Sequence, residues 1–243
     1  MQVRTFIIGL AVTLAITLGA LPLLAADTAA PPALKKGDRI VFLGDSITQG
    51  GGGDNGYITL IKKALDAQFA DFGIETINAG ISGHKVPDLQ KRLDKDVLDK
   101  KPTIVFIYIG INDVWHFSMA NHTGTPKDQY EAGLKDIIAR IKAAGARPIL
   151  CTASVIGEKH DGSNPQDKML DEYCDISRAV AKETGVQLTD LRKAFLDYEK
   201  ANNKENKEKG LLTGDRVHLS ADGNRFVADQ MLQTLGAKPT EKK

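Results

Sequence analysis

Ser46, Asp215 and His218 are residues whose types and spacing suit nucleophilic chemistry on a carbonyl group. A serine hydroxyl attacks a carbonyl only when a base takes its proton and another group orients that base. Asp215 lies three positions before His218, close enough in a loop to hold the imidazole while the other ring nitrogen faces Ser46. These residues predict acyl transfer, provided that the fold brings positions 46 and 218 together.

The stretch 44–48, Gly-Asp-Ser-Ile-Thr, also allows a simpler interpretation. Asp, Ser and Thr are favoured at helix N-termini, where their side chains accept backbone N–H groups. On this stretch alone, a helix cap and a nucleophile are equally good interpretations. Histidines are also more often structural than catalytic, and a structural role is the first hypothesis for His84, His116, His122 and His160. His218 differs from them because Asp215 accompanies it.

Elements of two kinds alternate along the chain and would have to position these residues. Short apolar runs predict strands at 39–43, 74–77, 104–109, 148–153 and 186–188. Apolar residues at helical spacing predict helices at 57–72, 86–98, 130–143, 167–183 and 191–198, and a last helix from 220 to 235. The alternation predicts an α/β fold, with a parallel sheet between two layers of helices in a three-layer α/β/α sandwich.

Polar residues follow the carboxyl ends of three predicted strands. Asp45 and Ser46 follow the first, a glycine-rich loop at 78–84 follows the second, and Asn112 comes shortly after the third. Ligands bind at the carboxyl ends of strands in open parallel sheets, so we expect these loops to share one edge with the 215–218 segment. The glycines at 50–53 lack the Lys and Ser/Thr of a phosphate-binding loop, which argues against a nucleotide site.

Length and composition indicate one domain, at 38–237, within the 243 residues. Arg4 is the only charge before Asp27, and residues 6–18 form a run of apolar and small residues that is too short to span a bilayer comfortably. Residues 1–26 end in Ala25-Ala26, which predicts a secretory signal peptide and a secreted or periplasmic protein. An uncleaved anchor is the alternative. Residues 27–37 are predicted to be an exposed lead-in and 238–243 a polar tail.

The charge of the chain bears on nucleic-acid and membrane partners, and its cysteines bear on disulfides and metal sites. The chain has 32 Lys and Arg against 31 Asp and Glu, so removal of Arg4 with the signal leaves it formally neutral. We therefore expect no nucleic-acid partner and no membrane association after signal cleavage. Cys151 and Cys174 are predicted to be buried free thiols, and their spacing implies no structural metal. The sequence leaves the oligomeric state open.

Four ordered segments resemble the four sequence blocks of the SGNH (GDSL-type) hydrolases. They are Gly44-Asp45-Ser46-Ile47, Ile81-Ser82-Gly83, Gly110-Ile111-Asn112-Asp113 and Asp215-Arg216-Val217-His218. The resemblance implies a flavodoxin-like five-stranded sheet of order 2-1-3-4-5 and no cofactor. It implies that Ser46 is the nucleophile of a triad with His218 and Asp215. The oxyanion hole would consist of the Ser46 and Gly83 N–H groups and the Asn112 amide, with Gly80 as the competitor for Gly83.

Finer features resemble the branch that contains acetylxylan esterases. They are the stretches 78–89, 109–115 and 215–218, and they imply a short-chain ester substrate, acetyl above all, on a small molecule or an oligosaccharide such as a xylan fragment. Asp45 and Trp115 are the expected substrate-binding residues, although Trp115 also suits an ordinary core position. Gly214 is a difference from a related acetylxylan esterase, which has a large aromatic residue at the corresponding position. The alternatives are a lipolytic esterase or acyl thioesterase, and a non-catalytic glycan-binding protein.

Overall fold

The computed structural model describes Met1 and residues 33–240. The predicted signal peptide, the first part of the lead-in and residues 241–243 lie outside the described residues, apart from Met1 itself. The helices and strands below all belong to one compact unit, Pro31–Lys243. Among the residues described, no helix has the length and apolar character needed to cross a membrane.

Five parallel strands form the central sheet, in the order β2-β1-β3-β4-β5. Their bounds are Arg39–Gly44 (β1), Glu75–Gly80 (β2), Ile104–Tyr108 (β3), Arg147–Cys151 (β4) and Gln187–Thr189 (β5). Every residue of β3 is buried, which accounts for its continuous apolar run, because a parallel sheet is covered on both faces. The predicted fold class and strand order are confirmed.

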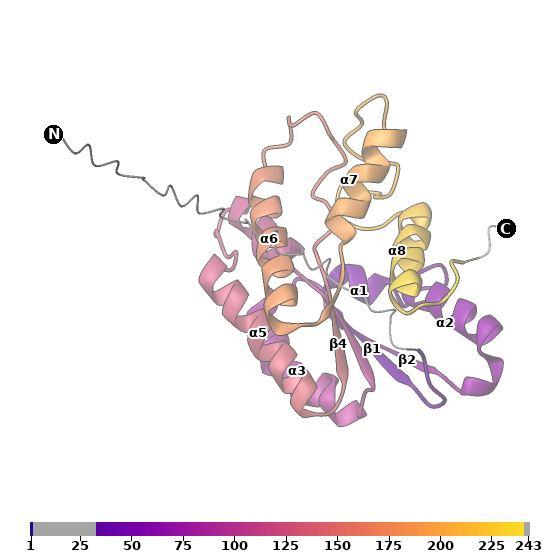
Figure 1. Cartoon of the computed structure of the whole chain (residues 1–243). Coiled ribbons are helices and arrows are strands. Elements are labelled where there is room, and N and C mark those ends of the chain that lie inside the picture. The colour runs from indigo at the N-terminus through magenta and orange to yellow at the C-terminus, as the bar shows by residue number, and fades with distance from the viewer. Residues whose placement is uncertain (2–32, 241–243) are drawn as a thin grey trace. The chain divides into compact units, whose positions relative to one another are not determined.

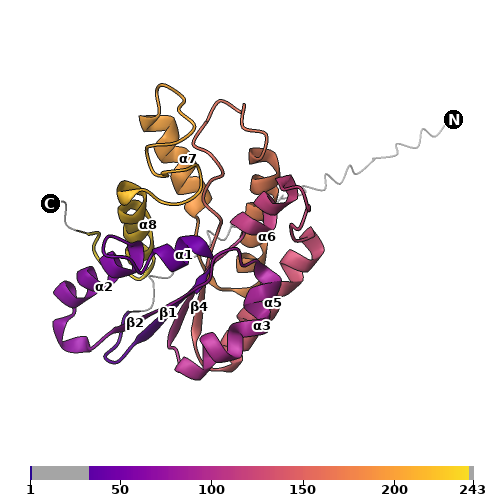
Figure 2. The same cartoon turned by 180° about the vertical axis from the view of Figure 1, so that it is seen from behind.

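Helices cover both faces of the sheet (Figures 1 and 2). One layer contains α3 (Val86–Asp96), α5 (Lys127–Ala143) and α6 (Asp167–Thr184), which pack against one another in that order. The other contains α2 (Tyr57–Gln68) and α8 (Ala221–Thr234), with α7 (Leu191–Asn202) packed on α8 through an edge-on contact of Phe195 with Phe226. The sequence positions of the predicted helices are thereby confirmed.

The core on the α2 side is aromatic. Phe42 of β1 and Phe106 of β3 are register partners, and their rings stack with centroids 5.2 Å apart. Tyr57 of α2 meets Phe42 edge-on at 5.9 Å. The Tyr57 hydroxyl donates to Thr48 Oγ1 at 3.0 Å, so this buried ring also supports the segment that follows β1.

Several boundaries differ from those predicted, because tertiary pairing decides them. β2 continues to Gly80 instead of stopping at residue 77, since its last residues pair with β1. α2 ends at Gln68, and a separate 3-10 turn at Ala70–Phe72 leads to Gly73. α7 extends to Asn202 rather than ending at residue 198.

The ends of the described region are more tightly held than expected. Leu34, in the predicted exposed lead-in, is buried in the core. In the predicted polar tail, the Lys238 N–H donates to the Gln68 side chain at 2.7 Å and the Thr240 N–H donates to Asp229 at 2.7 Å. Both ends therefore pack on the domain.

Candidate active site

The register of the sheet brings the loops after β1, β2 and β3 to one edge. Gly44, the last residue of β1, is level with Gly80 of β2 on one side and with Tyr108 of β3 on the other. The chain crosses from β1 to β2 and then returns to place β3 on the opposite side of β1. This change of direction creates the crevice in which open α/β sheets bind ligands.

Ser46 is the first residue of a short helix, α1 (Ser46–Gly50), directly after β1. Asp45 is its N-cap, and its Oδ1 accepts the Ile47 N–H at 2.9 Å. The capping interpretation is therefore confirmed for Asp45. The same turn leaves the Ser46 hydroxyl at the sheet edge, so capping and chemistry are compatible.

Asp45 is only 2% exposed, so its carboxylate lies beneath the site rather than on its surface. Burial raises the pKa of Asp45 to about 7, and the hydrogen bond from Ile47 partly opposes that rise. These contacts favour a role in shaping the Ser46 turn over the direct substrate contact expected from the sequence.

Ser46, His218 and Asp215 form a continuous hydrogen-bonded chain. The Ser46 hydroxyl lies 2.9 Å from His218 Nε2, and His218 Nδ1 lies 2.7 Å from Asp215 Oδ2. With its proton on Nδ1, donated to Asp215, the imidazole presents an unprotonated Nε2 to the serine. The structure thus joins residues from opposite ends of the domain in the arrangement that general-base activation of a serine requires.

Asp215 also organises its own loop. Its Oδ1 accepts the backbone N–H groups of Val217 at 3.1 Å and His218 at 2.8 Å. Partial burial tends to raise the pKa of Asp215, but hydrogen bonds from the His218 ring and these two N–H groups outweigh it and lower the pKa below its usual value. The carboxylate is therefore held in the ionised form that orients His218.

Glu158 anchors the segment that leads into this loop, and sequence reasoning missed it. Its side chain is fully buried and accepts the N–H groups of Leu211 and Leu212, each at 2.8 Å. It also accepts the N–H and the hydroxyl of Thr213, the latter at 2.7 Å. A buried carboxylate with four donors fixes the chain two residues before Asp215. Nothing in the local sequence distinguishes Glu158 from a surface glutamate.

The loop after β2 contains the backbone N–H groups that are expected to donate to an oxyanion. The Gly80 N–H donates to Asn78 Oδ1 at 2.8 Å, and the Ser82 N–H donates to Gln49 Oε1 at 2.8 Å. Within the described part of the chain, the Gly83 N–H donates to no protein acceptor. Gly83 also has φ +78°, in the left-handed region that favours glycine. These contacts favour Gly83 over Gly80 as the available donor.

Asn112 lies on a second short helix, α4 (Ile111–Trp115), which follows β3. It is 4% exposed, and its Nδ2 donates to the His84 carbonyl at 3.1 Å, which fixes the orientation of the amide. The helix is missed by sequence reasoning because five residues are too few to show a helical period. The second amide hydrogen of Asn112 is the one that is expected to donate to an oxyanion.

Neighbours of Asn112 complete the α4 region. Asp113 is fully buried and accepts the Val86 N–H at 3.1 Å, and burial raises the pKa of Asp113 to about 6. Trp115 is partly buried against the hydrophobic core. This position suits either interpretation of Trp115, as pocket wall or as core aromatic, and its substrate role stays a prediction.

Other residues singled out in the sequence have structural partners. His84 Nδ1 accepts Arg92 Nε, His122 Nδ1 donates to the Phe117 carbonyl, and His160 Nε2 donates to the Asn203 carbonyl. Cys151 and Cys174 are buried and unpaired, as predicted. Across residue 1 and residues 33–240, no group of three or more His, Cys, Asp or Glu side chains is arranged to hold a metal ion.

Comparison with known proteins agrees with this geometry. Residues 42–226 match the model of the GDSL-like lipase/acylhydrolase family. An acetylxylan esterase of Geobacillus stearothermophilus is 33% identical over 217 residues, which are 82% of this chain and 94% of the relative. A crystal structure of the acetyl xylan esterase AlAXEase is 44% identical, with a TM-score of 0.79, and covers 81% of this chain and 99% of its own.

Solved structures of Axe2, an acetylxylan esterase from Geobacillus stearothermophilus, are also similar. Three of them are 29% identical, with a TM-score of 0.75, and cover 86% of this chain and 99% of theirs. They are described as catalytic mutants of Axe2 in which alanine replaces a serine, a histidine and an aspartate. In Axe2 that aspartate lies three positions before the histidine, the same spacing as Asp215 and His218 here.

Proposed function

We propose that the chain, which belongs to the GDSL-like lipase/acylhydrolase family and is a carboxylic ester hydrolase, removes acetyl groups from carbohydrate. The residues proposed to carry out this reaction are Ser46, His218 and Asp215. The observation that carries this proposal is the hydrogen-bonded chain from the Ser46 hydroxyl through His218 to Asp215. The replaced serine, histidine and aspartate of the Axe2 catalytic mutants support it.

The proposed reaction follows from the positions of these side chains. Ser46 Oγ attacks the acetyl carbonyl carbon while its proton passes to His218 Nε2, and Asp215 stabilises the resulting imidazolium. The oxyanion is held by the Ser46 and Gly83 N–H groups and by the Asn112 amide. His218 then gives the proton to the departing sugar oxygen, and the alcohol leaves. A water molecule that is deprotonated by His218 attacks the acetyl-enzyme, acetate is released, and His218 returns that proton to Ser46 Oγ.

Acetylated xylan fragments are the proposed natural class of substrate. Acetylxylan esterases of known structure are similar over nearly their whole length, and without residues 1–26 the chain is formally neutral, so it has no net positive charge that would hold it at an anionic lipid. Export through the predicted signal peptide would place the enzyme where polymeric carbohydrate is found. The mass of the exported protein tests the export step, with cleavage after Ala26 expected.

The test of the reaction compares the wild-type protein with Ser46→Ala and His218→Ala on p-nitrophenyl acetate. We expect both variants to lose roughly three or more orders of magnitude in kcat, because members of a triad act as a unit. Circular dichroism of each variant controls for folding. A Ser46→Ala variant that keeps half of the wild-type rate would rule out the covalent mechanism.

The test of the substrate compares acetate release from acetylated xylo-oligosaccharides with hydrolysis of acetyl, butyryl, octanoyl and palmitoyl esters and of an acyl thioester. We expect kcat/KM to be highest for acetyl esters and to fall as the acyl chain lengthens. A preference for octanoyl or longer chains would instead assign the enzyme to the lipolytic class. A preference for the thioester would make it a thioesterase.

A further inference from the structure

Arg92, on α3, joins the carboxyl ends of β1 and β2. Its Nη2 donates to the Gly44 carbonyl at 2.8 Å, and its Nη1 donates to the Ala79 carbonyl at 2.8 Å. Gly44 directly precedes Asp45-Ser46, and Ala79 directly precedes the segment 80–83. The guanidinium thus sets the spacing between the strand that carries the nucleophile and the loop that carries Gly83.

The same guanidinium also reaches His84. Its Nε donates to His84 Nδ1 at 3.0 Å, which requires that nitrogen to be unprotonated. The main-chain carbonyl of His84 in turn accepts the Asn112 amide at 3.1 Å. Two consecutive hydrogen bonds therefore connect Arg92 to the side chain that we assign to the oxyanion.

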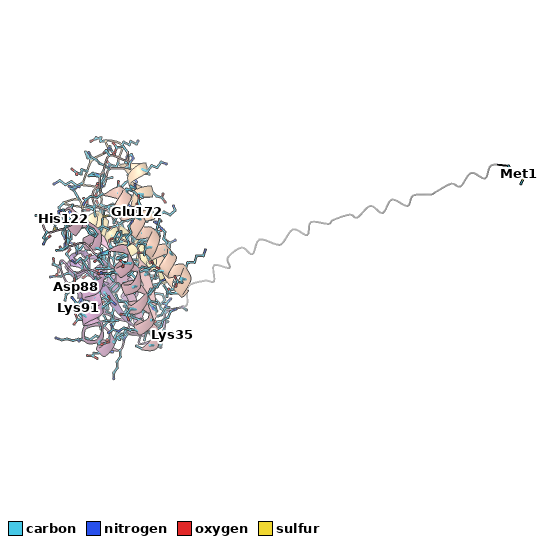
Figure 3. The ribbon with its side chains drawn as sticks, turned by 90° about the vertical axis from the view of Figure 1, so that its left-hand side faces the viewer. Met1, Lys35, Asp88, Lys91, His122 and Glu172 are labelled. Carbon is cyan, nitrogen blue, oxygen red and sulfur yellow. The ribbon has the colours of Figure 1, made fainter. Side chains whose placement is uncertain are left out.

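The surroundings of Arg92 make this arrangement rigid. Its side chain is 10% exposed and also pairs with Asp96 at 3.1 Å, so all three guanidinium nitrogens are engaged. Around His84, burial and the charge of Arg92 lower the pKa of the imidazole, as does Lys91, while Asp88 and Asp96 raise it. Asp88 and Lys91 are neighbours on α3 (Figure 3). The balance keeps His84 neutral and able to accept the Arg92 hydrogen bond.

We propose that Arg92 is a positioning residue for ester hydrolysis, which orients Gly83 and, through His84, Asn112 relative to Ser46. The inference rests on the proposed function, since it concerns donors that act in the transition state. A planar guanidinium with donors in a fixed fork can serve these four acceptors in different directions, whereas a lysine ammonium cannot hold the same set in place. A misplacement of about 1 Å in a catalytic constellation is enough to cost roughly 10²-fold in rate.

The first experiment measures kcat and KM for p-nitrophenyl acetate in Arg92→Lys. We expect kcat to fall roughly 10- to 100-fold with KM within about twofold of wild type, because the donors act mainly in the transition state. The control is Arg140→Ala, since Arg140 also donates to a main-chain carbonyl of α3, at Gln90, but away from the site. A kcat within twofold of wild type in Arg92→Lys would overturn the proposal.

A double-mutant cycle separates positioning from a general loss of stability. If Arg92 acts through Asn112, the kcat losses of Arg92→Lys and Asn112→Ala will be less than multiplicative in the double variant. If the kcat loss of the double variant equals the product of the two single losses, Arg92 does not act through Asn112, and the proposal is overturned. The measurement requires a wild-type enzyme that is active and a Ser46→Ala variant that is not, so a failure of the proposed function is recognised separately.

His84 gives a second route to the same answer if Arg92 variants fold poorly. Asparagine keeps an acceptor for the Arg92 Nε–H, whereas phenylalanine removes it. We expect His84→Phe to lower kcat as Arg92→Lys does, and His84→Asn to recover most of that loss. Equal kcat values in the two His84 variants would contradict the role of this hydrogen bond.

Discussion

Asn112 provides the test of the oxyanion assignment at the scale of a single residue. Asn112→Ala should lower kcat for p-nitrophenyl acetate by roughly 10²–10³ with little change in KM, because an oxyanion donor acts mainly in the transition state. Asn202→Ala is a suitable control, since Asn202 is exposed and its amide donates only to a carbonyl within α7. A rise in KM with unchanged kcat would identify Asn112 as a substrate-binding residue.

Trp115 tests whether the site is adapted to sugars. A sugar ring in the leaving group would pack on an aromatic face, so Trp115→Ala should reduce kcat/KM on acetylated xylo-oligosaccharides more than on p-nitrophenyl acetate. Trp115→Phe keeps an aromatic face and should retain most of the preference. Equal losses on the two substrates would assign Trp115 to the core.

Asp45 predicts a pH dependence of stability. Burial places the pKa of Asp45 at about 7 in the folded protein, against about 4 in the unfolded chain. The folded state therefore binds the proton more tightly, and the contribution of Asp45 to stability is lost as pH rises from about 4 to about 7. Relative to Asp45→Asn, the free energy of unfolding of wild type should fall by up to about 4 kcal/mol over that range.

The measurement is urea unfolding of wild type and Asp45→Asn at pH 5 and pH 8. Asparagine keeps an oxygen that can accept the Ile47 N–H, so the comparison isolates ionisation. A difference between the two proteins that is the same at both pH values would contradict the raised pKa.

At this scale, some residues could be predicted from sequence and others could not. Ser46, Asp215 and His218 were predictable as a group, because Asp215 and His218 lie in one loop and polar residues end the first strand. Arg92 was not, because its importance comes from the Gly44 and Ala79 carbonyls, which approach it only in the folded sheet. The residues next to such a side chain in the sequence form no pattern that would identify its role, because its partners are backbone carbonyls of other segments.

At the scale of elements, α7 contains a buried carboxylate, Glu199, that lacks, among the residues the structure describes, the hydrogen bonds which Glu158 accepts. Glu199 is fully buried, and within the described residues neither of its oxygens has a hydrogen-bond partner. Burial raises the pKa of Glu199 to about 8, so the folded protein keeps this side chain neutral below that pH. The stability that depends on the neutral form is lost as pH rises from about 4 toward about 8.

Replacing Glu199 by an apolar side chain of similar length should therefore stabilise the protein. We expect Glu199→Met to raise the free energy of unfolding by about 1–3 kcal/mol near pH 8 and by less near pH 5. Glu172→Met is the control, since Glu172 is a partly exposed glutamate on α6 whose carboxylate pairs with Lys127 at 2.6 Å (Figure 3). A destabilised Glu199→Met variant at pH 8 would show that the carboxylate is satisfied in solution.

The strands and the long helices were predictable, and the short helices were not. β3 is a continuous apolar run because both of its faces are buried, α5 and α6 show the helical period of one buried face, and the positions of all three agree with the sequence to within a few residues. α1 and α4 have five residues each, and their existence depends on Asp45 as a cap and on the turn at Gly110. The site is built on these two short helices, so the sequence predicted its residues better than its local structure.

The two cysteines give a prediction for the molecule as a whole. Both are buried and unpaired, and burial raises the pKa of each thiol to about 12. Neither should react with a thiol reagent such as DTNB in the native state, and both should react after denaturation without a reductant. Denatured protein that shows no free thiol until reduced would demonstrate a disulfide.

Ser46 and His218 lie 172 positions apart in the chain, so the ribosome adds Ser46 long before it adds His218. A ribosome adds residues at about 5–20 per second, so roughly 10–30 s pass between the two. Throughout that interval the nascent chain contains Ser46 but not His218. By the proposed mechanism, hydrolytic activity appears only when translation is nearly finished, and we expect a chain that terminates before His218 to be inactive however well its first strands have paired.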